Sequence, residues 1–278
     1  MQLKDIIVCV VSASADASAI DLGHQIAMDC DAHIACSAIG ILQSPVLYTE
    51  FGMGAAPVGL LNHENALINQ FFAELKEVLD KRFPLIELRP DKTYSPNLES
   101  RVATMTRYAD IAVIRAPSKE ESHPYIQLIE AALLGSGRPV LVAPVDWIPG
   151  PIGRKIVIGW DASAEAARAM HDALLLTSED AEVSIVTVDA RSGSLDHGDA
   201  PGLDIAAHLA RHGLKVELRN EGSLGRPTHE VLMQVATDTN ADLMVLGGYR
   251  HSRLQQSLFG GVTRSMLRDV MLPLLLSH

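Results

Sequence analysis

The sequence predicts an α/β protein: two tandem Rossmann-like α/β/α sandwiches, each with a mostly parallel five-stranded sheet. The first observation is length, because 278 residues are long for one compact domain and sufficient for two of roughly 140. The second is composition. Hydrophobic residues make up 47% of the chain and aromatic residues only 4%, so aliphatic side chains must build the cores, as they do in parallel sheets covered by helices. The third is that the strand and helix patterns of one half recur, in the same order, in the other.

The internal repeat is weak in sequence but constant in order. Each half opens with an aliphatic strand, a polar turn and a helix, later contains an Ala-Asp step into a strand, and closes on a helix, a proline and a last strand. Proline is tolerated at the first position of a strand because no ladder hydrogen bond is lost there. The corresponding segments are 6–27 and 155–176 for the opening, 109–118 and 241–250 for the Ala-Asp step, and 135–144 and 267–278 for the close.

A segment rich in proline and glycine, residues 147–153, is typical of a linker and divides the chain. We therefore predict domains at 1–146 and 154–278. The first domain has an insertion around residues 42–62, which is apolar for a loop and is expected either to pack on its own domain or to form a lid. In the second domain, periodicity and breakers predict strands near 155–160, 182–188, 214–219, 242–247 and 272–276, and helices near 163–177, 202–212, 228–239 and 261–270.

Charge and cysteine usage exclude several classes of function. The formal net charge of −11, from 34 acidic and 23 basic residues, argues against a nucleic-acid partner. Cys9, Cys30 and Cys36 are odd in number and lack CxxC spacing, so we expect reduced thiols rather than disulfides or a zinc site. The chain opens directly into a strand pattern, and no apolar run approaches the ~18 residues needed to span a bilayer. We expect a cytoplasmic protein without a signal peptide or membrane partner.

Polar residues and glycines in the second half follow strands whose carboxyl ends share one sheet edge. In an open parallel sheet, ligands bind beyond this edge, where the direction of winding reverses. Asp161 follows the first strand of this half, and the segment from Gly247 to Thr263 follows the fourth. Glycines allow backbone N–H groups to approach an anion, and the helix after Gly260 would point its positive end at the same place. With Arg250 adding positive charge, the pattern predicts a ligand that bears phosphate.

The second half resembles the universal stress protein family. The segments that carry the resemblance are IVIGWDAS, VSIVTV, ADLMVLGGYRHSRLQQSLFGGVTRSML and PLLLSH, in the family's order of elements. The resemblance implies a tandem, stress-response binding and signalling module that binds ATP or a related adenine nucleotide, with Mg²⁺, in its C-terminal domain. It implies at most slow ATP hydrolysis, with no catalytic residue and no metal held by the protein alone. The alternative is a protein-interaction scaffold of the same family that binds no nucleotide.

Four positions match the family's nucleotide site. Asp161 corresponds to the aspartate that holds adenosine, and Val188 to the backbone position that contacts adenine. The family's phosphate loop is Gly, two residues, Gly, nine residues, Gly and then Ser or Thr. In this loop Gly247 corresponds to the first glycine and Gly260 to the third.

Two positions of the loop depart from the family's pattern. Arg250 replaces the second glycine, which costs about 1 kcal/mol if that position needs a positive φ. Gly261 replaces the Ser or Thr, and the lost hydrogen bond is worth about 1 kcal/mol. Val262 and Thr263 complete the predicted site, and the hydroxyl of Thr263 is a candidate substitute. Together the changes are expected to weaken the site about ten- to a hundredfold without abolishing it.

The first half resembles a degenerate copy of this site. Ser12 stands where the aspartate is expected, and Gly135 alone survives as a loop-closing glycine, so we predict no nucleotide pocket there. The resemblance also implies pairing through the last strands, residues 141–144 and 274–278. This pairing would form either within one chain, as a pseudo-dimer of its two halves, or between chains, as a homodimer.

The residues that suggest chemistry also have simpler possible roles. Asp161 could cap the helix that follows it, which is compatible with binding ribose. His208 and His212 are spaced i, i+4 on a predicted helix, a spacing that can place two metal ligands on one face. Because the sequence shows no third ligand, we expect exposed helix histidines rather than a metal site.

Overall fold

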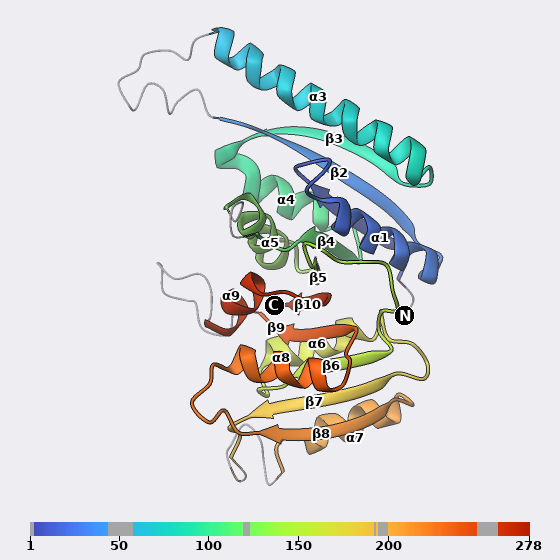
Figure 1. Cartoon of the computed structure of the whole chain (residues 1–278), viewed down its shortest axis with the longest axis vertical. Helices are drawn as coiled ribbons and strands as arrows, with labels where there is room; N and C mark the ends of the chain where they lie inside the picture. The colour runs from blue at the N-terminus through green and yellow to red at the C-terminus, as the bar shows by residue number, and fades with distance from the viewer. Residues whose placement is uncertain (1–2, 44–57, 119–122, 192, 194–199, 249–260) are drawn as a thin grey trace.

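A single ten-stranded sheet runs through the whole molecule (Figure 1). The computed structural model describes residues 3–43, 58–118, 123–191, 193, 200–248 and 261–278. The strand order is β3-β2-β1-β4-β5-β10-β9-β6-β7-β8. Each half of the chain therefore contributes five neighbouring strands, which agrees with the predicted α/β class.

The elements alternate between strand and helix in both halves. In the first half they are β1 (Asp5–Val10), α1 (Ala17–Cys30), β2 (His33–Leu42), α3 (Val58–Arg82), β3 (Glu87–Tyr94), the 3₁₀ turn η1 (Ser95–Asn97), α4 (Leu98–Thr106), β4 (Ile111–Arg115), α5 (His123–Ser136) and β5 (Val140–Ala143). In the second half they are β6 (Lys155–Gly159), α6 (Ala164–Ala173), β7 (Glu182–Val188), α7 (Leu203–Arg211), β8 (Lys215–Glu221), α8 (Thr228–Asp238), β9 (Leu243–Gly247), α9 (Gly261–Arg268) and β10 (Leu274–Ser277).

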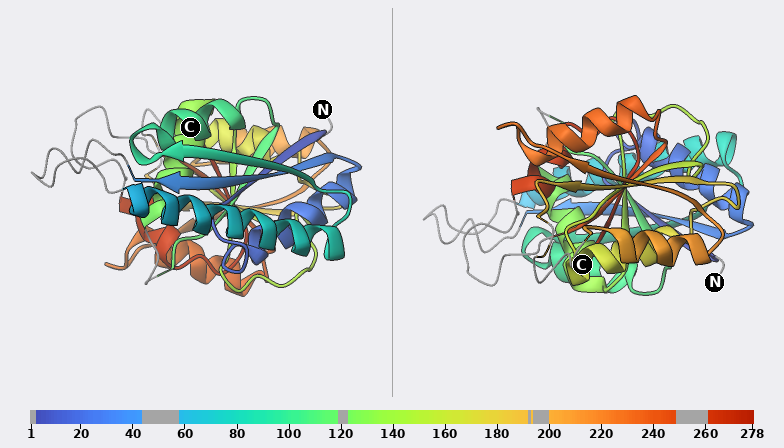
Figure 2. Two further views of the ribbon diagram at one scale, coloured as in Figure 1. Left: turned by 90° about the horizontal axis from the view of Figure 1, so that it is seen from above. Right: turned by 90° about the horizontal axis from the view of Figure 1, so that it is seen from below.

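Helices cover both faces of the sheet, so the protein has three layers (Figure 2). One face carries α1, α3, α6 and α7, whose buried side chains form a cluster with those of the strands. The other face carries α4, α5, α8 and α9 and a second cluster. Each cluster draws residues from both halves of the chain, so the apolar core is continuous across the midpoint of the sheet.

The two halves join through their last strands. β5 and β10 pair antiparallel, with Leu141 opposite Leu275, whereas the strands within each half pair parallel. Both strands follow a proline, Pro139 or Pro273, whose carbonyl accepts a bond from the neighbouring strand although its nitrogen has no hydrogen to donate. The structure thus shows the pairing within one chain, as a pseudo-dimer.

The predicted elements of the second half are all present, with shifts of a few residues at their ends. The main difference is the helix expected over 163–177, because α6 ends at Ala173. The next residues form a turn instead, in which Leu176 N donates to Ala173 O at 2.9 Å. Gly153 explains this turn: its φ is +75°, and a Cβ there would lie 1.8 Å from Leu176 O. Only glycine allows the chain to pass this close.

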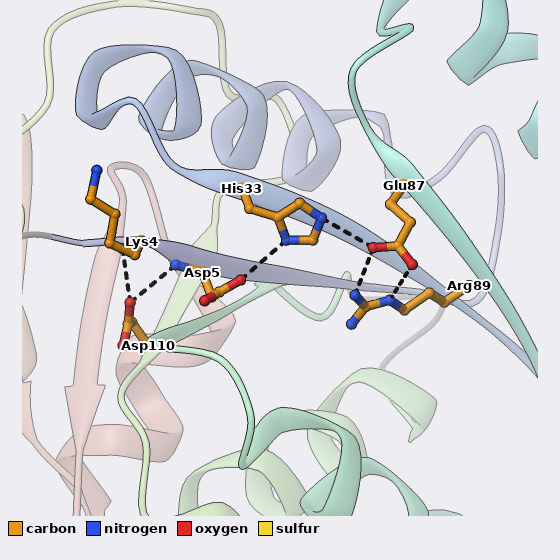
Figure 3. A network of polar contacts seen from close by, with 6 residues as sticks. All are labelled: Lys4, Asp5, His33, Glu87, Arg89 and Asp110. Carbon is orange, nitrogen blue, oxygen red and sulfur yellow. Dashed lines mark hydrogen bonds and ion pairs between the residues drawn. The ribbon is translucent and has the colours of Figure 1, made fainter.

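The Ala-Asp step repeated in the two halves has a structural role. The Asp242 carboxylate accepts hydrogen bonds from the backbone nitrogens of Gly153, Arg154 and Lys155, at 2.8 to 3.1 Å. In the first half the Asp110 carboxylate accepts from the nitrogens of Lys4 and Asp5, at 2.8 and 3.0 Å (Figure 3). Each aspartate therefore binds N–H groups where the first strand of its half begins.

Removing this carboxylate is expected to destabilise the second half. Asp242→Ala leaves three backbone N–H groups without their acceptor, and we expect a loss of about 1–3 kcal/mol in the free energy of unfolding. Asp242→Asn keeps one acceptor oxygen and should lose less. Urea denaturation measures both variants, and equal stability of Asp242→Ala and the unchanged protein would contradict the assigned role.

No disulfide joins Cys9, Cys30 and Cys36, which all lie among the described residues. Cys9 in β1 and Cys36 in β2 are buried, and burial raises the pKa of Cys9 to about 12. Both thiols are therefore protonated and unreactive at neutral pH. Within the residues that the structure describes, no helix is long and apolar enough to cross a membrane.

Candidate functional site

The sheet of the second half reverses its direction of winding between β6 and β9. From β6 the chain proceeds to β7 and β8 on one side, and then crosses to β9 and β10 on the other. In β6, Gly159 lies opposite Val186 of β7 and Leu246 of β9. The predicted site residues Asp161, Val188 and Gly247 follow these positions by one or two residues, so the structure brings all three to one edge.

Asp161 lies exposed just beyond β6. Its Oδ1 accepts a hydrogen bond from the backbone nitrogen of Ser163 at 3.1 Å. The N-cap of α6 is Ser163, whose Oγ accepts from Ala166 N at 3.0 Å. The possibility that Asp161 caps the helix is therefore not realised: Asp161 orders the turn, and the hydroxyl of Ser163 caps the helix.

Gly247 is explained by packing. A Cβ at this position would lie 2.5 Å from Ala166 N and 2.7 Å from Glu165 C, both in the first turn of α6. The end of β9 and the N-terminus of α6 are thus in direct contact, with no room for a side chain between them. The N-terminus of a helix carries a partial positive charge, so this contact places it at the same edge as Asp161.

Gly248 is held by the end of the chain and by the first half. Its nitrogen donates to Ser277 O at 2.8 Å, and its carbonyl lies 3.0 Å from His278 Nδ1. A Cβ on Gly248 would lie 2.9 Å from Leu133 Cδ2 of α5. The backbone at which the predicted phosphate loop begins is therefore fixed on both sides.

The structure describes three of the five remaining predicted residues. Gly261 begins α9, Val262 is 37% exposed and Thr263 is 4% exposed. The hydroxyl of Thr263 therefore belongs to a buried residue, which weakens it as a substitute for the family's Ser or Thr. Arg250 and Gly260 lie outside the described residues.

The first half differs at the equivalent edge. Ile6 pairs with Ile111 as Ile156 pairs with Leu243, so the strand register places Val11 level with Asp161. The expectation that Ser12 occupies this position is therefore wrong by one residue, because the turn after β1 is longer than the turn after β6. By the same register Arg115, at the end of β4, corresponds to Gly247.

A buried cluster of Asp16, Arg115 and Tyr125 fills this edge of the first half. Asp16 Oδ2 accepts hydrogen bonds from Val11 N at 2.7 Å and Ser12 N at 3.0 Å, and Arg115 Nε donates to its Oδ1 at 3.2 Å. The Arg115 guanidinium lies 3.8 Å from the centre of the Tyr125 ring. The Asp16 and Arg115 side chains are 0% and 2% exposed.

Hydrogen bonds and an ion pair within the cluster oppose the cost of burying the Asp16 carboxylate. Burial raises the pKa of the Asp16 carboxyl above its usual range, while its hydrogen bonds and the Arg115 guanidinium act to lower it. Burial and the nearby Asp16 also raise the pKa of the Tyr125 phenol. A side chain thus stands in the first half where the second half has a glycine. The sequence gives no hint of this pair, because its members are 99 residues apart.

Two hollows in the described part of the protein lie away from the predicted site. One, of about 360 Å³, lies along the amino ends of β6, β7 and β8. Another, of about 600 Å³, lies where the two halves meet and is lined from both, by residues such as Asp110, Arg138, His171 and Asp172. Among the described residues, no group of three or more His, Cys, Asp or Glu side chains is arranged to hold a metal ion.

Comparison with known proteins identifies the second half. Residues 153–278 match the model of the universal stress protein family. These residues therefore form a universal stress protein domain. A search of curated proteins finds no significant match.

Solved structures extend the likeness in fold to the whole chain. A universal stress protein from Archaeoglobus fulgidus DSM 4304 superposes with a TM-score of 0.68 at 15% identity, covering 100% of this chain and 99% of that one. A functionally unknown protein from Pseudomonas aeruginosa PAO1 gives a TM-score of 0.58 at 11% identity, covering 99% and 92%. The whole chain, including its first half, therefore has the tandem fold of these structures.

Proposed function

We propose that the C-terminal universal stress protein domain binds ATP or a related adenine nucleotide, as part of a cytoplasmic stress-response module. The observation that supports the proposal is the meeting of Asp161, Val188 and Gly247 at one edge of the sheet, at the point where the winding reverses. Open α/β sheets bind ligands at this point. We further propose that the N-terminal domain, residues 1–146, is a structural partner without a nucleotide site, and that 147–153 link it to the domain at 154–278.

Each group in the proposed site has a chemical role. The exposed carboxylate of Asp161 accepts hydrogen bonds from the ribose hydroxyls, and the backbone at Val188 contacts the adenine ring. The phosphates lie toward the start of α9, where helix N–H groups and the helix dipole favour negative charge. Arg250, between Gly247 and Gly260, supplies a cation for them.

Magnesium fits this site only as a companion of the nucleotide. Mg²⁺ keeps several waters and is commonly held by one or two carboxylates together with substrate phosphates. Because the described residues contain no ligand cluster for a metal, the phosphates would supply its main contacts. We propose no dedicated catalytic reaction.

The proposal predicts a selective loss of affinity in Asp161→Ala. Hydrogen bonds to a charged group are worth about 1.5–3 kcal/mol, so we expect the Kd for ATP to rise about ten- to a hundredfold. The exposed position of Asp161 predicts little change in thermal stability. Calorimetric titration measures the affinity, and Ser12→Ala, in the turn after β1 of the first half, is the control, which should bind as the unchanged protein does.

Two outcomes would redirect the proposal. If the protein co-purifies with no nucleotide and shows no binding at millimolar ATP, it is better described as an interaction scaffold. If Ser12→Ala weakens binding as much as Asp161→Ala does, the site has been assigned to the wrong half. ATP turnover that is equal in Asp161→Ala and the unchanged protein would indicate binding without catalysis.

A further inference from the structure

Three histidines meet where α6 and α7 lie together, away from the proposed nucleotide site. His171 lies in the last turn of α6, His208 in the last turn of α7, and His212 caps the end of α7. The ring centres of His171 and His208 are 5.2 Å apart, and those of His208 and His212 are 4.8 Å apart. Both pairs meet edge to face, so His208 contacts an imidazole on each side.

The central ring is poorly placed to carry a charge. His208 Nε2 is buried and has no hydrogen-bond partner within the described residues. Protonation would make this nitrogen a donor with no acceptor and would place a positive charge between two other imidazoles. Burial, His212, His171 and Arg211 all lower the pKa of His208, in that order of effect.

A hollow beside the three histidines allows protons to reach them. His171 and His212 line the hollow of about 600 Å³ between the two halves. The Asp172 carboxylate in this hollow accepts a hydrogen bond from Ser277 Oγ at 2.7 Å, so it is already engaged. The charged and titratable groups that face the cluster are His212 and Arg211 from α7, His171 and Asp172 from α6, Glu179 from the turn after α6, and Asp110 and Arg138 from the first half.

α7 has little else to hold it in place. It is nine residues long, and Leu209 is its one buried side chain. Ile205 and Ala206 are partly buried against the core. Gly202, at the start of the helix, packs closely on Leu218 of the edge strand β8, where a Cβ would lie 2.6 Å from Leu218 Cδ1. A short helix with so little buried apolar area opens at a low cost in free energy.

We propose that His171, His208 and His212 form a proton-sensitive latch, which holds α7 against α6 when the His208 imidazole is neutral and releases it when that imidazole is protonated. A lowered pKa in the folded state means that the folded state favours the neutral form of His208. The stabilisation is therefore fully present above the ordinary histidine pKa of about 6.5 and is lost as the pH falls through and below that value.

Hydrogen exchange measured by mass spectrometry tests the latch on the full chain. After correction for the intrinsic exchange rate, we expect the protection of residues 203–211 to fall by up to about tenfold between pH 7.5 and pH 5.5, whereas α8 should keep its protection. In His208→Leu, which cannot be protonated, most of this loss should disappear. His229→Leu on α8 is the control and should behave as the unchanged protein does.

A second pair of variants keeps the test decisive if His208→Leu folds poorly. His171→Gln and His212→Gln alter exposed rings and should each reduce the fall in protection without changing the His208 side chain itself. Protection of α7 that is equal at the two pH values would overturn the proposal. A loss that persists unchanged in His208→Leu, or in the double glutamine variant, would overturn it as well. None of these results depends on whether the protein binds a nucleotide.

Discussion

Replacing Arg115 with alanine is expected to lower the free energy of unfolding by about 3–5 kcal/mol, because it leaves a buried carboxylate without its cation. Asp16 is 0% exposed and Arg115 is 2% exposed, so water cannot replace the lost guanidinium without opening the fold. The variant also loses the contact between Arg115 and the Tyr125 ring. Urea denaturation followed by circular dichroism measures the effect.

Two control variants distinguish the effect of breaking the buried ion pair from the effect of removing any arginine. Arg101 forms an ion pair with Asp91 at 2.6 and 2.8 Å, but its side chain is 49% exposed. Arg101→Ala should therefore cost about 0–1 kcal/mol. The double variant Asp16→Asn with Arg115→Met removes both charges and should cost less than the sum of the single variants. Similar losses of stability in Arg115→Ala and Arg101→Ala would show that the buried pair contributes no more to stability than the exposed one.

Leu275→Ala is expected to destabilise both halves together, by about 2–5 kcal/mol. Leu275 is 0% exposed in β10 and lies opposite Leu141 of β5, which is also 0% exposed. Both belong to the buried cluster that runs through the two halves. A cavity at this point removes contacts between the two halves that neither half can replace alone. The loss of stability should therefore affect the strands of both halves.

The measurement must follow each half separately. Fluorescence of Trp147 and Trp160, which pack on the core, reports on the linker and the second half, and hydrogen exchange in β1 reports on the first. We expect the two transitions to shift by the same amount. Leu218→Ala on the edge strand β8 is the control: because this side chain is 37% exposed, its loss should be clearly smaller. A shift confined to the second half would show that the halves unfold independently.

The arrangement of elements could be predicted from sequence because its signals are local. Aliphatic runs such as ADLMVL predict buried parallel strands wherever they occur. Pro273 marks the start of β10 through the chemistry of one residue. Pairing of the last strands within the chain joins segments that are far apart in the sequence. It was therefore predicted only as one of two possibilities, the other being pairing between two chains.

Features that depend on contacts between distant segments were not predicted. The hydrogen bond that Arg115 donates to Asp16 depends on the length of the turn after β1, and the strand register there places Val11 in the position expected for Ser12. Gly247 was interpreted through phosphate binding, but the packing of β9 on α6 also requires a glycine there. A residue type can thus satisfy the fold and a ligand at once, and sequence alone does not separate the two.

The antiparallel contact between β5 and β10 has a consequence for how the protein behaves in a cell. When two separate chains pair through their last strands, the pair dissociates at low concentration and its members can exchange with related chains. Here the chain itself tethers both strands, so their local concentration is fixed and does not change on dilution. The two unlike halves therefore always occur in a ratio of one to one, whatever the level of expression.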